Sequence, residues 1–88
     1  MELKRGKVVR SKAGRDQGSL LAVLSTEPPW AVLADGKGRP LERPKRKKLM
    51  HLSPTLTVLS EEALATNRKL RAALREAGGQ RENIPAEV

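Results

Sequence analysis

The chain has 88 residues, room for one small domain, and it contains no cysteine, one histidine and one aromatic residue. This composition excludes disulfides and thiolate metal sites, and the single histidine, His51, without a cysteine or a second histidine, argues against a metal site. The 18 lysines and arginines outnumber the 10 aspartates and glutamates, so the formal net charge is +8 and favours a polyanionic partner.

The first half of the chain predicts three short strands. Two adjacent valines favour extended backbone within residues 6–14, where a strand enters a loop. Residues 19–25 are apolar nearly throughout, so the second strand is expected to be central in the sheet. A turn is predicted at residues 26–30, because two prolines cannot sit in a sheet interior. The third strand is predicted at residues 30–34.

A turn and two further strands are predicted next. Residues 35–38, DGKG, favour a tight turn because glycine supplies the positive φ that hairpins need. Two prolines keep residues 39–44 out of regular pairing. A fourth strand should start near Lys47 and be interrupted at residues 53–55, before a short fifth strand at 56–60. Five short strands linked by turns predict a mainly β fold, a small sandwich or barrel.

The last third of the chain predicts a helix. Residues 60–79 are rich in alanine, leucine, arginine and glutamate, with Ser60 as the cap and a glycine pair as the stop. The apolar stripe is narrow, so the helix must dock on the barrel, on RNA or on another protein. Residues 80–88 are expected to form a disordered tail. The stripe consists of Ala63, Leu70, Leu74 and Ala77.

The loop between the first two predicted strands carries a recognisable pattern. Residues 6–24, GKVVRSKAGRDQGSLLAVL, follow G-x-V-V-x-S-x-x-G-x-x-x-G and then an apolar strand. This resembles the KOW motif, the β-loop-β signature of ribosomal proteins and of some transcription elongation factors. Gly14 and Gly18 match its structural glycines. Asp16 and Gln17 depart from the motif, which usually has a basic residue at that place.

The resemblance extends over residues 2–59. VLADGKGRPLERPKRKKLMHL, residues 32–52, looks like the second half of stand-alone bacterial KOW-domain RNA-binding proteins. These look related to a large-subunit ribosomal KOW protein of archaea and eukaryotes. The resemblance implies an SH3-like (KOW) barrel of about five strands over residues 1–59, followed by the C-terminal α-helix. It also implies ribosomal RNA of the large subunit and neighbouring ribosomal proteins as partners.

A basic run, RPLERPKRKK, occupies residues 39–48, and six of its ten residues are cationic. Because it lies between two predicted strands, we expect a folded RNA-facing rim. The single aromatic residue, Trp30, is expected in the core or as a plug at the barrel edge rather than as a base stacker. Sheets that read single-stranded RNA by stacking need several exposed aromatic residues, so we expect recognition of RNA backbone and shape, with a few base-edge contacts from arginine. The expected contacts are Arg10, Ser11, Lys12, Arg15, Arg39, Arg43, Lys45, Arg46, Lys47 and Lys48, with further contacts from Arg68, Lys69, Arg71 and Arg75 on the helix.

No catalytic constellation is present, since the chain has no cysteine, no tyrosine and only scattered carboxylates. We therefore expect no enzyme activity, cofactor, metal or small-molecule substrate. No apolar run approaches the ~18 residues of a membrane span, and no apolar h-region follows the charged N-terminus, so we expect no signal peptide. We expect a cytoplasmic, ribosome-associated RNA-binding protein. A transcription elongation accessory and a protein–protein adaptor stay open as alternatives.

Overall fold

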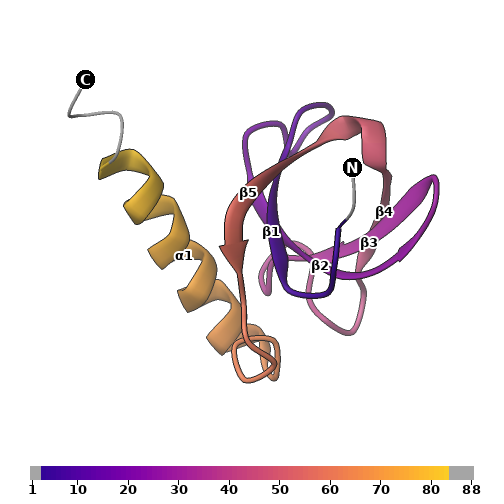
Figure 1. The fold of residues 1–88 in the computed structure, drawn as a ribbon. Helices are drawn as coiled ribbons and strands as arrows, with labels where there is room; N and C mark the ends of the chain where they lie inside the picture. Colours follow the sequence, from indigo (N-terminus) through magenta and orange to yellow (C-terminus); the bar gives the residue numbers. More distant parts are fainter. Residues whose placement is uncertain (1–2, 84–88) are drawn as a thin grey trace.

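The computed structural model describes residues 3–83, with the backbone alone for residues 79–83. One antiparallel sheet of five strands is followed by one C-terminal helix (Figure 1). The elements are β1 (Lys7–Ser11), β2 (Leu20–Glu27), β3 (Trp30–Ala34), β4 (Lys45–Lys48), the 3₁₀ helix η1 (Leu49–His51), β5 (Leu52–Val58) and α1 (Asn67–Asn83). The prediction of a mainly β fold with a C-terminal helix is confirmed.

The strand order is β4-β3-β2-β1-β5, so β4 and β5 are the two edges of the sheet. Only the three residues of η1 separate these edges along the chain. The sheet therefore curls until one end of β4 lies near one end of β5, and the curvature is visible in the ribbon (Figure 1).

Apolar side chains cover both faces of the sheet, because side chains alternate between its two faces. On the inner face, seven buried residues form one cluster: Leu3, Val9, Leu21, Val23, Ala31, Leu33 and Leu52. On the outer face, Val8, Ala22 and Ala34 pack with Leu64, Leu70 and Leu74. The helix thus docks on the sheet of its own chain, and the nearly continuous apolar character of β2 is explained by burial on both faces.

The predicted break at residues 53–55 is wrong, because β5 runs through Pro54 without interruption. Pro54 pairs with Val9 of β1, and β5 has no strand on its other side. An edge strand tolerates proline, since the missing N–H need not serve a second neighbour. The predicted continuation of the fourth strand is also wrong, because Leu49–His51 form η1 and β4 begins at Lys45.

The proline turn is shorter than predicted. β2 continues to Glu27, which pairs with Trp30 at the start of β3. Only Pro28 and Pro29, joined by a cis peptide bond, lie between the two strands. Pairing therefore continues up to the first proline, the residue that lacks an N–H to donate.

The helix begins later and ends later than predicted. Residues 60–66 form turns, in which the Ala63 N–H donates to Ser60 Oγ at 3.2 Å. The cap of α1 is Thr66, whose Oγ1 accepts from the Lys69 N–H at 3.1 Å. The predicted glycine stop is wrong, since α1 continues to Asn83 and includes the first residues of the predicted tail. The remainder of that tail, residues 84–88, lies outside the described residues.

Candidate nucleic-acid interface

The β1–β2 loop, residues 12–19, is a compact turn. Gly14 and Gly18 have φ values of 87° and 90°, positive values that glycine adopts readily. The Gly18 N–H donates to the Ser11 carbonyl at 2.8 Å, and the Arg10 guanidinium donates to the Gly18 carbonyl. These bonds hold the loop in one shape while its two cations, Lys12 and Arg15, remain exposed.

Asp16 turns from this loop toward the edge strand β4. Its Oδ1 lies 3.2 Å from Lys47 Nζ, and its Oδ2 lies 3.7 Å from Lys45 Nζ. Strand register explains the approach, because Lys47 pairs with the buried Ala31 and so shares its inward direction. The loop is therefore tied across β4, and the acidic residue that departs from the KOW pattern has a structural role.

Two of the predicted RNA contacts are buried in this arrangement. Ser11 is 2% exposed, and its hydroxyl lies 2.9 Å from the Ala13 carbonyl and 3.1 Å from Asp16 Oδ1, so its one proton is used within the loop. Lys47 is 8% exposed and donates to Asp16. Neither group is free to meet a phosphate, and we leave both out of the proposed contact surface.

The pKa of Asp16 reflects this cluster. Burial raises it, but hydrogen bonds from Lys47 and Ser11 and the charges of Lys47 and Lys45 outweigh burial, so the pKa lies below its ordinary value of 3.8. A carboxylate with a lowered folded-state pKa contributes stability above its unfolded pKa. That contribution is lost as pH falls through the lower folded-state value.

Asp16→Asn should lower the free energy of unfolding at pH 7 by about 1 to 3 kcal/mol, because Lys47 stays buried without its anion. The difference from the wild type should shrink as pH falls below 3.8 and vanish once Asp16 is protonated. Urea unfolding at stepped pH measures it. Glu27→Gln, at an exposed carboxylate, is the control and should change stability by less than about 0.5 kcal/mol. An Asp16→Asn protein as stable as the wild type at pH 7 would contradict the role given to this cluster.

The outer face of β3 and β4 carries cations beside an aromatic ring. Arg46 Cζ lies over the Trp30 ring, 4.8 Å from its centroid, and Lys48 Nζ lies 5.6 Å from it. Both cations are exposed, and Trp30 is half-buried and belongs to neither apolar cluster. The prediction that Trp30 lies in the core is therefore wrong. The β4 register places the ring on the outer face, opposite Lys48.

The β3–β4 loop, residues 35–44, is ordered by side chains. Asp35 Oδ1 accepts the N–H groups of Lys37 and Arg39, each at 2.8 Å, so its predicted role as a turn residue is confirmed. Asn67 at the start of α1 accepts the Leu41 N–H at 2.8 Å. These bonds fix the backbone from which Arg39 and Arg43 project into solvent.

Asn67 makes a second hydrogen bond to the β3–β4 loop, which the sequence did not reveal. Asn67 Nδ2 donates to Glu42 Oε1 at 2.9 Å, and this bond lowers the pKa of Glu42. Glu42, the one acidic residue of the basic run, thus bonds to the helix rather than to a neighbouring cation. The partners are 25 residues apart, so no local pattern links them.

The four predicted contacts on α1 differ in their surroundings. Lys69 pairs with Glu62 at 3.6 Å. Arg71 and Arg75 line a surface hollow of about 370 Å³ between α1 and the β3–β4 loop, together with Lys37. Sequence reasoning missed Lys37; its position between two turn glycines was the available signal. Arg68, the remaining predicted helix contact, is exposed.

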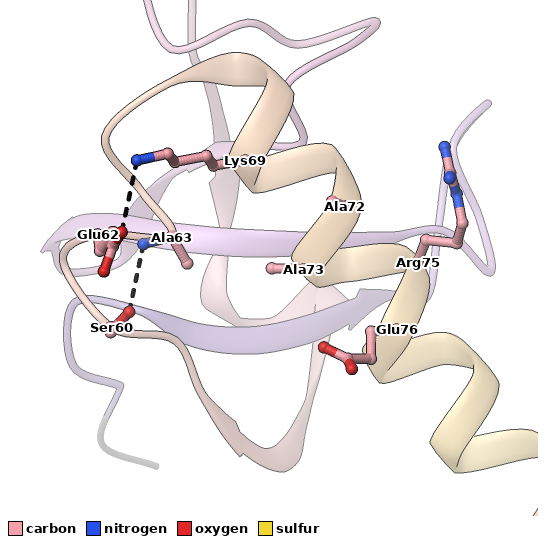
Figure 2. Close-up of a pocket in the computed structure, with 8 residues that line it drawn as sticks. All are labelled: Ser60, Glu62, Ala63, Lys69, Ala72, Ala73, Arg75 and Glu76. Atoms are coloured by element: carbon pink, nitrogen blue, oxygen red, sulfur yellow. Dashed lines mark hydrogen bonds and ion pairs between the residues drawn. The ribbon is translucent and has the colours of Figure 1, made fainter.

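A larger hollow of about 620 Å³ lies between α1 and the preceding turn (Figure 2). Figure 2 shows the side chains of Ala72 and Ala73 on the helix side, and some of the polar groups at the rim already have partners. Glu62 is paired with Lys69, and Ser60 accepts from the Ala63 backbone.

Comparison with known proteins adds no relative: no protein-family model matches the chain, and no curated protein matches it. Among residues 3–83, no helix is long and apolar enough to cross a membrane. Among the side chains that the structure describes, those of residues 3–78, no three His, Asp or Glu gather closely enough to hold a metal ion. The resemblance to KOW-domain proteins therefore depends on its own motif residues.

The structure thus brings the predicted contacts together in two groups, one on the β1–β2 loop and β4 and the other on the β3–β4 loop and α1. Asp16 brings the β1–β2 loop against β4, and Asn67 brings the β3–β4 loop against α1. The two groups are continuous, because β4 follows directly on the β3–β4 loop.

Proposed function

We propose that the chain is an RNA-binding protein of the KOW type that binds structured ribosomal RNA of the large subunit, in the cytoplasm, through its sugar–phosphate backbone. One observation carries the proposal: six of the predicted contacts are exposed cations on β4 and the two loops beside it, and they form no ion pair within residues 3–78. Phosphate contacts would relieve their mutual repulsion and release counterions. The six are Lys12, Arg15, Arg39, Arg43, Arg46 and Lys48.

We also propose that the sheet forms an SH3-like KOW barrel, and the strand order supports this. Strands of the order β4-β3-β2-β1-β5 place β4 and β5 at the two edges, and η1 brings one end of each edge together. Closure of the sheet along these edges would give a five-stranded barrel. The motif loop of the KOW resemblance, with Gly14 and Gly18, would then lie beside the basic strand that it contacts through Asp16.

Ultraviolet crosslinking in cells, followed by sequencing of the attached RNA, tests the proposed ligand. One tight cluster of sites in large-subunit ribosomal RNA is the expected result. A scatter of sites over many transcripts would replace ribosomal RNA by RNA in general. The absence of crosslinked RNA, with a known RNA binder crosslinked in parallel, would overturn the proposal. Co-purification with polymerase instead of ribosomal subunits would favour the transcription elongation role.

Binding of structured RNA should weaken steeply with salt. With about six phosphate contacts, the slope of log K against log salt concentration should be roughly −4 to −5. The double reversal Arg46→Glu with Lys48→Glu should make this slope shallower by roughly 2. Filter binding across a salt series measures both values. The matched control, Lys4→Glu with Lys7→Glu, makes the same change in net charge on β1 and the residues before it, and should leave the slope nearly unchanged. Equal slopes for both double variants would contradict a contact surface centred on β4.

A protein–protein adaptor is the second candidate, and one observation favours it. The edge strand β5 exposes apolar side chains at Leu56, which is 98% exposed, and at Val58. Such a surface suits a protein partner. Partner binding that is insensitive to the charge reversal on β4 would favour the adaptor over the RNA-binding protein.

A further inference from the structure

Trp30 is the one aromatic residue of the chain, and it lies at the start of β3. The side chains on either side of Val32, Ala31 and Leu33, enter the inner apolar cluster. Alternation therefore sends Trp30 and Val32 to the outer face. The helix covers the far end of that face, around Ala34, while Trp30 lies outside both clusters.

Arg46 and Lys48 lie against the Trp30 ring, and no carboxylate that the structure describes neutralises their charge. Arg46 Cζ is 4.8 Å and Lys48 Nζ 5.6 Å from the ring centroid, both within the range of a cation–π interaction. Among the side chains of residues 3–78, neither cation has an acidic partner. Arg46 is exposed. Its guanidinium is planar and can stack on a second π-system on the side away from the ring.

We infer that Arg46, positioned by Trp30, is a stacking surface for one unpaired RNA base, and that Lys48 contacts the adjoining phosphate. Bases that leave the helical stack pack on arginine planes and aromatic rings in many RNA complexes. Every base has a π-face, so the surface selects an unpaired nucleotide rather than a base identity. The inference rests on the proposed RNA-binding function and adds a preference for structured RNA that carries a bulged nucleotide.

The plainer explanation is that the ring and its cations only stabilise the sheet edge. The two explanations differ in what they predict for RNA. A purely structural cation–π pair attracts phosphates but does not distinguish a paired from an unpaired base. A stacking surface distinguishes them, and it changes the surroundings of the one tryptophan when it does so.

The experiment uses two RNA duplexes that differ by a single bulged adenosine, with the full chain. The wild-type protein should bind the bulged duplex roughly tenfold more tightly, the contribution of one stacked base. The fluorescence of Trp30 should be quenched by the bulged duplex but not by heparin, a polyanion without bases.

Three variants locate the effect. Arg46→Lys keeps the charge but loses the planar group, so the preference for the bulged duplex should be lost while binding to both duplexes stays salt-dependent. Arg43→Lys is the matched control at an exposed arginine of the same basic run, and should keep the tenfold preference. Trp30→Leu removes the ring that positions Arg46, and should also lose the preference.

The outcomes separate this inference from the function on which it rests. Salt-dependent binding of both duplexes with equal affinity by the wild type would overturn the inference alone. An Arg46→Lys protein that keeps the preference would overturn it as well. No salt-dependent binding to either duplex would overturn the proposed function together with the inference.

Discussion

Replacing Gly36 by alanine should lower the free energy of unfolding by about 2 to 5 kcal/mol, through a strained backbone and an overpacked contact. Gly36 has a φ of 80°, a value that side chains with a Cβ rarely adopt. An added Cβ would overlap the Asn67 carbonyl oxygen and lie 2.9 Å from Arg71 Cγ. The β3–β4 loop would have to move away from the first turn of α1. Urea unfolding followed by circular dichroism measures the change.

Gly38→Ala is the matched control in the same turn. Gly38 lacks a positive φ, and an added Cβ would meet no atom within 4 Å. Its substitution should change stability by less than about 0.5 kcal/mol. Equal stability of the two variants would show that the loop does not pack on the helix as described. A destabilised Gly36→Ala should also bind structured RNA less tightly, since the displaced loop carries Arg39 and Arg43.

Leu70→Ala should also lower the free energy of unfolding by about 2 to 5 kcal/mol, since it deletes buried carbon atoms and leaves a cavity. Leu70 is 0% exposed and lies in the cluster between α1 and the outer face of the sheet. A helix of this length is marginal without its docking surface. Part of the helical circular dichroism signal should therefore be lost at a lower urea concentration than in the wild type.

Leu56→Ala is the control for that substitution, because it deletes the same atoms from a side chain that is 98% exposed. It should change stability by less than about 0.5 kcal/mol. If Leu70→Ala unfolds like Leu56→Ala, the helix does not depend on the outer face of the sheet. A Leu70→Ala protein that is too unstable to purify would leave Leu74→Ala, at a 7% exposed position of the same cluster, as the milder test.

The parts of the fold that depend on residues adjacent in the sequence could be predicted. β3 begins and ends where the sequence predicts, because an apolar run between a proline turn and an Asp-Gly turn has few other conformations. The predictions were wrong where contact with a residue far along the chain determines the local structure. Pro54 remains in a strand because β5 is an edge. The helix starts at Asn67 rather than Ser60 because residues 60–66 turn to bury Leu64 against the sheet.

The candidate site shows the same division. The basic run and the glycine loop are evident in the linear pattern, since each depends on composition and spacing alone. The linear pattern does not show which cations reach solvent, because the direction of each β4 side chain follows from the register with β3. That register turns Lys47 inward to Asp16 and Arg46 outward to Trp30.

The sequence alone was therefore enough for a mainly β domain with a C-terminal helix and for a concentrated positive charge. These properties depend on composition and on contacts within a few residues. Only the tertiary structure decided where the helix docks, which of the predicted contacts are buried, and that Trp30 lies beside two cations on the outer face. Each of these depends on strand order and register, which bring together residues as far apart as Val9 and Pro54. Such pairings are selected by the burial of two apolar faces at once, and no local stretch of the chain contains that information.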